Sequence, residues 1–205
     1  MTIRGRRVLR AVATAVIAAA LGAALCAAVI DRDHPRPQVL SALEIGFAQD
    51  MTAHHQQAVT MADMLAADAS PEVTALAEQI RFTQLVEIGQ MTGWLQLAGA
   101  APSSTEPMTW MTDHGSAHHD HAMAMPGMAT PDELARLQRS TGPDNETQFL
   151  TLMTRHHQGG IAMASYAFQR TGNDTVRRAA SIMVTEQTGE IQLMTLMLDG
   201  HRGVR

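Results

Sequence analysis

The chain has 205 residues, enough for one domain or two closely packed halves with attachments at the ends. Aromatic residues make up only 3% while methionine is abundant, with 15 residues, and this composition favours helices over a β-sandwich or barrel. The formal net charge of −5 argues against a nucleic-acid-binding protein, whereas an acidic chain suits a cation binder.

Residues 11–30 form an uncharged, alanine-rich run that follows four arginines. A run of this length can just span a bilayer, and the arginines before it place the rest of the chain on the outer side. Small residues near its end fit a cleaved signal peptide equally well. We therefore expect an exported protein with a signal peptide or membrane anchor over 1–30 and an extended spacer over 31–40. It is then either anchored on the outer face of the cell membrane or, if cleaved, periplasmic or secreted.

The only cysteine, Cys26, lies inside this apolar run. The folded part of the chain therefore has no disulfide and no thiolate metal site. Any binding of a soft metal must come from methionine and histidine.

The rest of the chain, 41–205, contains an internal repeat. The motif Met-x-x-His-His-Gln occurs at 51–56 and again at 153–158. Each copy is followed by Gln-x-x-Glu-Ile-x-x-Met, at 84–91 and at 187–194. Repetition of this kind indicates two copies of one supersecondary unit.

The first copy is predicted to form a helical hairpin over 42–98. The sequence Ser-x-x-Glu at 41–44 is a capping box, which predicts a helix that begins at about Ala42 and meets no breaker before Ser70. Ser70 is expected to cap the second helix, with Pro71 at its first position. The turn between them is short enough only for an antiparallel pair.

The middle segment, 99–130, has no helical period and is rich in Ala, Ser, Pro and Gly, so we expect a flexible connection. Short tracts rich in histidine suggest metal binding, and added thioethers favour copper over magnesium or calcium. A linker whose histidines are incidental remains the alternative. The candidate ligands of this secondary site are His114, His118, His119, His121, Met123, Met125 and Met128.

The second copy is predicted to form another hairpin, over 145–199. The sequence Thr-Pro-Asp-Glu at 130–133 opens a short helix over 131–141 before it. Gly172 is expected to end the first helix of the hairpin and Gly200 the second. Two such hairpins pack most simply as an antiparallel four-helix bundle, so the predicted fold class is all-α.

The register within each hairpin follows from counting residues away from the turn at about 1.5 Å per residue. The first histidine of each motif comes level with the Gln and Glu of the returning helix, and the methionine before it comes level with a methionine. The level pairs are His54 with 84–87, Met51 with Met91, His156 with 187–190 and Met153 with Met194. These level residues form an apolar seam, a line along the inward face of each helix that the first histidine interrupts. The second histidines, His55 and His157, lie about 100° around the helix from this seam and are expected at its boundary or in solvent.

Polar groups inside an apolar seam cost roughly 1–3 kcal/mol each when they lack a partner. Two explanations remain open. Each histidine could donate to the glutamate across its hairpin in a purely structural layer. Alternatively the same residues hold a cation, because imidazole with thioether suits Cu(I), and imidazole with carboxylate suits Cu(II) or zinc. The candidate ligands in the bundle are Met51, His54, His55, Glu87, Met91, Met153, His156, His157, Glu190 and Met194.

The doubled His-His motif, its Gln-x-x-Glu-Ile partner and Met-Pro-Gly-Met at 125–128 resemble the domain-of-unknown-function family numbered 305, over about 41–200. The resemblance implies a bundle similar to ferritin-like proteins. Some members are exported copper binders, which implies that the four motif histidines and neighbouring methionines are ligands. This chain departs from an exact repeat at Leu152, where the first copy has Asp50, and at 159–160, where Gly-Gly replaces Gln-Ala. Unequal affinity of the two halves is expected.

We therefore expect an exported metal-binding protein that sequesters copper or delivers it to a protein partner; zinc is the second choice of metal. The alternative is a helical interaction module with no bound metal. An enzyme is not expected, because di-iron bundles use Glu-x-x-His on two helices plus further glutamates, which this chain lacks. It also has no nucleotide-binding glycine loop and no Cys-x-x-Cys motif.

Overall fold

The computed structural model describes residues 16–23, 26, 39–111 and 125–203. The chain divides into two units, Met1–Gln38 and Val39–Arg205. In the first unit, residues 16–23 are helical and exposed to solvent. Much of the predicted signal or anchor segment, and nearly all of the predicted spacer, lies outside the described residues. No helix in the described part of the chain is long and apolar enough to cross a bilayer.

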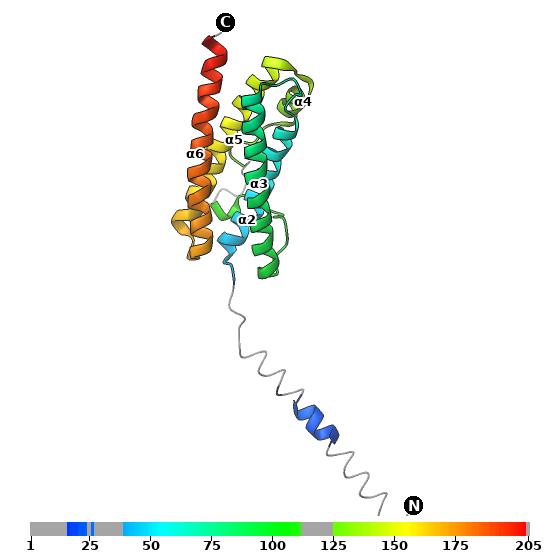
Figure 1. Ribbon diagram of the computed structural model, residues 1–205. Coiled ribbons are helices and arrows are strands. Elements are labelled where there is room, and N and C mark those ends of the chain that lie inside the picture. Colours follow the sequence, from blue (N-terminus) through cyan, green and yellow to red (C-terminus); the bar gives the residue numbers. More distant parts are fainter. Residues whose placement is uncertain (1–15, 24–25, 27–38, 112–124, 204–205) are drawn as a thin grey trace, which may run out of the picture. The chain divides into compact units, whose positions relative to one another are not determined.

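The second unit is built from helices. They are α2 (Ala42–Asp63), α3 (Pro71–Ala98), the 3-10 helix η1 (Thr109–Met111), α4 (Pro131–Arg139), α5 (Gly142–Arg170) and α6 (Asp174–Gly203). Helix α3 packs on α2, α6 packs on α5, and α2 packs on α5 to join the two hairpins (Figure 1). The predicted all-helical bundle is confirmed, whereas its likeness to ferritin stays a prediction.

Side-chain contacts give the direction of the helices. His55 of α2 contacts Glu87 of α3, and Asp63, further along α2, contacts Arg81, earlier on α3. The two helices therefore run antiparallel. The same ordering holds in the second hairpin, where His157 contacts Glu190 and Thr154, earlier on α5, contacts Met194, later on α6.

Both predicted capping boxes are present at the helix starts. The Ser41 backbone N–H donates to the Glu44 carboxylate over 2.7 Å, and the Glu44 N–H donates back to the Ser41 hydroxyl. Thr130 and Glu133 make the same reciprocal pair at the start of α4. Each pair satisfies backbone donors that the first turn of a helix leaves free.

The prediction that the first helix continues to Ser70 was wrong, because α2 ends at Asp63. Two polar side chains of α5 hold the connection that follows. Asn145 accepts from the Ala66 backbone N–H, and Glu146 accepts from both the N–H and the hydroxyl of Ser70. Ser70 is therefore engaged by Glu146, and its side chain does not cap α3 as predicted.

Two predicted glycine stops were also wrong. Helix α5 ends at Arg170 with Thr171, in an extended conformation, as its cap, so Gly172 has no left-handed capping role. The Thr171 hydroxyl instead donates to Glu44 of α2 over 2.6 Å. Helix α6 continues through Gly200 to Gly203. A glycine costs a helix only about 1 kcal/mol, which packing elsewhere on the helix offsets.

Two hydrophobic clusters fill the bundle, one towards each end. The first includes Met61, Ile80, Phe149, Met153 and Met194, and the second includes Phe47, Met51, Met91, Met163 and Met183. Met51 and Met91 share one cluster and Met153 and Met194 share the other, as the residue count predicted. Along each long helix, the members of one cluster end before those of the other begin. Polar residues occupy the interval.

Candidate metal centre

A layer of polar side chains from all four long helices separates the two hydrophobic clusters. We call it the polar layer; its members are His54, His55, Gln84, Glu87, His156, His157, Gln187 and Glu190. The four histidines are at most 1% exposed and the most exposed member, Glu87, reaches only 8%. The two motifs, predicted as two matching sites, thus meet in one place.

The second histidine of each motif pairs with the glutamate of its own hairpin. His55 Nε2 lies 2.7 Å from Glu87 Oε2, and His157 Nε2 lies 2.7 Å from Glu190 Oε2. The prediction that these two histidines lie at the boundary or in solvent was wrong, since both are fully buried. A rotation of about 100° around a bundle helix does not lead to solvent; it leads from one neighbouring helix to the next.

The first histidine of each motif faces the other hairpin. The rings of His54 on α2 and His156 on α5 stack with their centroids 3.7 Å apart and their planes 30° apart. His54 Nε2 also lies 3.0 Å from the backbone carbonyl oxygen of Pro126. The two hairpins therefore touch through imidazoles at the centre of the bundle.

Burial keeps these imidazoles neutral. It lowers the pKa of His54 to about 3, with a further contribution from the neighbouring His55. Burial and the nearby His157 lower the pKa of His55 to about 3, although Glu190 acts in the opposite sense. The pKa of His156 is well below its ordinary value for the same reasons, burial first and then His54. A neutral imidazole is the form that binds a metal ion.

The pKa of Glu87 is shifted in the opposite direction. Burial, and then the charge of Glu190, raise the pKa of Glu87 to about 7. Above that pH the Glu87 carboxylate is an acceptor only, so the hydrogen on His55 must be on Nε2, the atom that faces it. His54 Nε2 faces a carbonyl oxygen and carries its hydrogen for the same reason. In both rings Nδ1 then has a free lone pair.

Within the described residues, every buried side-chain nitrogen or oxygen that has no hydrogen-bond partner belongs to the polar layer. These atoms are Nδ1 of His54, His55 and His157, both ring nitrogens of His156, Oε1 of Gln84, and Nε2 and Oε1 of Gln187. Buried polar groups in folded proteins are nearly always paired, and leaving one unpaired costs about 1–3 kcal/mol. Their concentration in one layer indicates a place that receives a ligand or ordered water.

The histidine–glutamate pairs match the surroundings of metal-binding histidines. A ligating imidazole commonly donates its other N–H to a carboxylate or a backbone carbonyl, which fixes the ring. His55 and His157 have the carboxylate, and His54 has the Pro126 carbonyl. These contacts fix the ring orientations and leave Nδ1 as the nitrogen without a partner.

The ligand set is not closed in this structure. Among the residues described, no three His, Cys, Asp or Glu side chains converge as a ready metal site. The predicted thioether donors lie next to the polar layer: Met51, Met91, Met153 and Met194 are fully buried in the flanking clusters. A metal ion would be held by a smaller set of imidazoles completed by thioethers, or after rotation of a side chain.

Comparison with known proteins places this arrangement in a family. The model of the domain of unknown function DUF305 matches residues 44–198. The chain belongs to the DUF305 family. No protein with a curated description matches it.

Solved structures of two DUF305 proteins and of CopM share the fold. A DUF305 protein from Streptomyces coelicolor has 39% identity over 78% of this chain and 92% of its own, with a TM-score of 0.69. A DUF305 fragment from Deinococcus radiodurans has 31% identity over 78% and 97% of the two chains, with a TM-score of 0.65. CopM in its Cu(I)-bound form has 26% identity over 77% and 96%, with a TM-score of 0.59.

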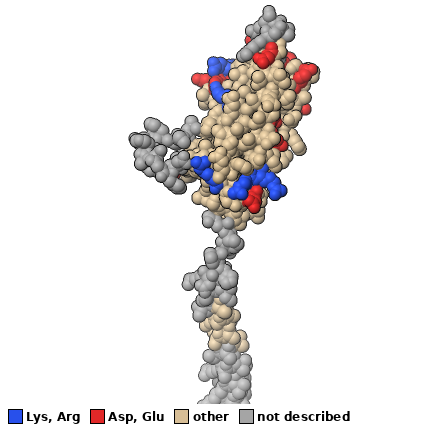
Figure 2. Space-filling model, turned by 90° about the vertical axis from the view of Figure 1, so that its left-hand side faces the viewer, with Lys and Arg blue, Asp and Glu red and all other residues tan. Residues whose placement is uncertain are grey.

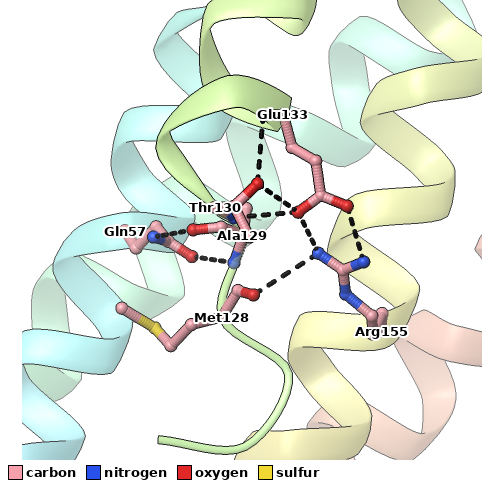
Figure 3. A network of polar contacts seen from close by, with 6 residues as sticks. All are labelled: Gln57, Met128, Ala129, Thr130, Glu133 and Arg155. Atoms are coloured by element: carbon pink, nitrogen blue, oxygen red, sulfur yellow. Dashed lines mark hydrogen bonds and ion pairs between the residues drawn. The ribbon is translucent and has the colours of Figure 1, made fainter. Parts of the chain in front are cut away.

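The predicted linker site is described only at its end. His114, His118, His119, His121 and Met123 lie outside the described residues. Residues 125–130, which we call the strap, cross α2 and α5 (Figure 3). Met125 packs against the second hydrophobic cluster, and Met128 accepts from Arg155 through its backbone carbonyl. The strap places the carboxyl end of the linker against the polar layer.

The strap is held by residues that sequence analysis did not single out as functional. The Gln57 amide donates to the Ala129 carbonyl over 3.0 Å and accepts from its N–H over 2.6 Å. Arg155 makes two hydrogen bonds to the Glu133 carboxylate, 2.8 and 2.6 Å long. These contacts, drawn in Figure 3, tie α2, the strap, α4 and α5 together.

The close contact between the strap and α5 requires glycine at position 159. A Cβ on Gly159 would collide with the backbone carbonyl of Pro126, and one on Gly127, where φ is +76°, with the Arg155 carbonyl. At the other end of the linker, Asp50 accepts from the Met108 N–H over 2.6 Å and from Trp110 Nε1 over 2.8 Å. The sequence could have pointed to these linker contacts, because Asp50, Gln57 and Gly159 are positions at which the two copies of the repeat differ.

Proposed function

We propose that this protein is an exported binder of copper that sequesters the ion or delivers it. The observation that carries the proposal is the set of buried imidazole nitrogens in the polar layer that have free lone pairs and no partner. Such a set is costly in an empty core and useful in a metal site. Copper is favoured over zinc because neutral imidazoles and thioethers are the donors that Cu(I) selects.

The related structures support this choice of metal. CopM, 26% identical to this chain, has been solved in Cu(I)-bound and Cu(II)-bound forms. Export is supported by the arginines and apolar run at the N-terminus, and by the Streptomyces coelicolor relative, which is named as a candidate secreted protein. We propose a binding role without catalysis.

We assign different roles to the predicted ligands. The donors are the imidazoles of His54, His55, His156 and His157, with the flanking methionines as soft partners. Glu87 and Glu190, predicted as ligands, act instead as positioning groups, because each already accepts the Nε2 hydrogen of a histidine. The bound ion would supply Lewis acidity and, for copper, a one-electron couple; the chain supplies a water-poor enclosure for it.

The test is an anaerobic Cu(I) titration of the full-length protein against a competing chelator. We expect a dissociation constant tighter than about 1 μM. The variant His54→Leu/His156→Leu should remain folded, since these rings make few polar contacts, and should lose the tightest site. A matched control, His118→Ala/His119→Ala/His121→Ala, changes only the linker and should keep it. Binding weaker than micromolar in the wild type, or complete loss in the linker variant alone, would contradict the proposal.

The structural alternative is an interaction module whose polar layer only fixes register. The two His–Glu pairs favour it, because they give two of the four polar-layer histidines a partner without any metal. In that case the wild type does not bind Cu(I) tightly, and the His54→Leu/His156→Leu variant stays folded with its function unchanged. The titration therefore distinguishes the two functions.

A further inference from the structure

The polar layer is sealed on the side of the strap. His54 and His156 are each 1% exposed, and the Pro126 carbonyl covers His54 Nε2. The strap fits against α5 so closely that neither Gly127 nor Gly159 has room for a Cβ. An ion that entered here would have to break the Gln57–Ala129 and Arg155–Glu133 contacts first.

The side between α3 and α6 is open. A groove of about 520 Å³ runs between these helices, and Glu87 of the polar layer forms part of its lining. Its walls include Val86 from α3 and Ala179 and Ile182 from α6. Figure 2 shows the face of the molecule that carries α6, where charged side chains gather towards the ends and uncharged ones cover most of the middle. The groove thus connects solvent with a polar-layer residue between largely uncharged walls.

Two carboxylates, Glu186 and Glu87, line the groove. Glu186 is exposed and lines the groove, and Glu87 lies deeper and bonds His55. Partial burial, and then the charges of Glu87 and Glu190, raise the pKa of Glu186. Negative groups in a cleft with low-dielectric walls concentrate cations. Arg178, a basic residue of the lining, lies eight residues from Glu186, about 12 Å along α6.

We propose that the groove between α3 and α6 is the route by which the metal ion enters and leaves the polar layer. Glu186 attracts the ion at the mouth, and Glu87 is the first polar-layer group that it meets. Beyond Glu87 lies the imidazole of His55, whose Nε2 hydrogen Glu87 accepts and whose Nδ1 has no partner and is free to bind the ion. This route rests on the proposed function, since it serves the same site.

The route is tested by stopped-flow binding of Ag(I), a soft ion without redox chemistry, to the full-length protein. The kinetic phase that is absent from His54→Leu/His156→Leu reports the polar layer. Val86→Trp and Ile182→Trp narrow the groove from positions that are 56% and 47% exposed, so folding is little affected. Association and dissociation should both slow by about tenfold or more while the dissociation constant stays unchanged.

Three matched variants complete the design. Leu196→Trp adds the same bulk to α6 at a residue that is 68% exposed and outside the groove lining, and it should bind at the wild-type rate. Glu186→Gln should slow association, more so at low salt, because it removes an attracting charge. Arg155→Gln, which weakens the strap, should leave the rates unchanged.

The outcomes separate the route from the function. If Ag(I) binds the polar layer and the two tryptophan variants keep wild-type rates, the groove is not the route. Faster binding by Arg155→Gln would also overturn it, in favour of entry under the strap. If the wild type shows no polar-layer phase at all, the proposed function itself fails.

Discussion

The two hairpins of this bundle carry the same chemistry and differ in how they hold the linker. Each has a buried His–Glu pair of 2.7 Å, and each contributes one imidazole to the central stack. The first difference is at Asp50, which accepts a hydrogen bond from the start of the linker, where the second copy has Leu152. The second is at Gln57, which bonds the strap, where the second copy has Gly159, whose lack of a Cβ leaves room for the strap. The two copies of the repeat therefore match in the polar layer and differ in how they contact the linker.

This comparison changes the meaning of the imperfect repeat. The sequence led us to expect unequal metal affinity in the two halves because of these substitutions. In the structure Asp50, Gln57 and Gly159 all contact or accommodate the linker and its strap, and none of them belongs to the polar layer. We therefore infer that the two halves contribute to one shared centre and not to a strong and a weak site.

The largest expected effect comes from breaking a His–Glu pair. His55→Leu leaves the Glu87 carboxylate buried without its partner and should lower the free energy of unfolding by about 3 kcal/mol at pH 8. His157→Leu should cost the same if the hairpins are equivalent. The double variant His55→Leu/Glu87→Leu should recover most of the loss. Urea unfolding measures all of these; a single variant as stable as the wild type would contradict the pairing.

A smaller effect is expected from making the second copy like the first at the strap. Gly159→Gln forces a side chain against the Pro126 backbone and should cost about 2 kcal/mol. Gly89→Gln is the matched control, because Gly89 lies in α3 with nothing within 4 Å of an added Cβ. It should be neutral or slightly stabilising. If both changes have the same effect on the urea midpoint, the strap does not need the glycine.

Making the first copy like the second at the linker's start should cost less. Asp50→Leu removes the acceptor of the Met108 N–H and of Trp110 Nε1, but it also replaces a buried carboxylate with an apolar side chain. We expect a loss of about 1 kcal/mol. Release of Trp110 should shift its fluorescence maximum to longer wavelength. An unchanged emission spectrum would show that Asp50 does not hold this indole.

The smallest effect near neutral pH concerns the central stack. The folded-state pKa of His54, about 3, lies below the ordinary value of 6.5, and that of His156 is lowered too. Their contribution to stability is therefore complete above about pH 6.5 and is lost as the pH falls towards 3. Metal-free His54→Leu/His156→Leu should gain in stability relative to the wild type over that window. A constant difference between the two proteins would show that these imidazoles titrate normally.

Local signals predicted much of this fold. The capping boxes at Ser41 and Thr130 located the starts of α2 and α4, because a cap depends on neighbours three residues away. The end of α2 could not be predicted in this way. The connection that follows α2 is held at Ala66 and Ser70 by Asn145 and Glu146, which belong to another helix.

The candidate site was predicted in composition and not in pairing. Counting from the turn brought the right residues to one level but assigned the glutamate to His54 when His55 holds it. A bundle helix has two inward directions, towards its hairpin partner and towards the other hairpin. Only the packing of α2 against α5 decides which histidine takes which. This packing joins residues far apart in the sequence, so the pattern of apolar residues along one helix does not predict it.

The most direct test of the metal centre is ¹⁵N NMR of the histidine rings during anaerobic addition of Cu(I), which is diamagnetic. We predict that Nδ1 of at least one of His54, His55 and His157 shifts as it becomes a ligand, while Nε2 of these rings keeps its hydrogen towards Pro126, Glu87 and Glu190. Unchanged Nδ1 signals from all four bundle histidines in a protein saturated with Cu(I) would contradict it.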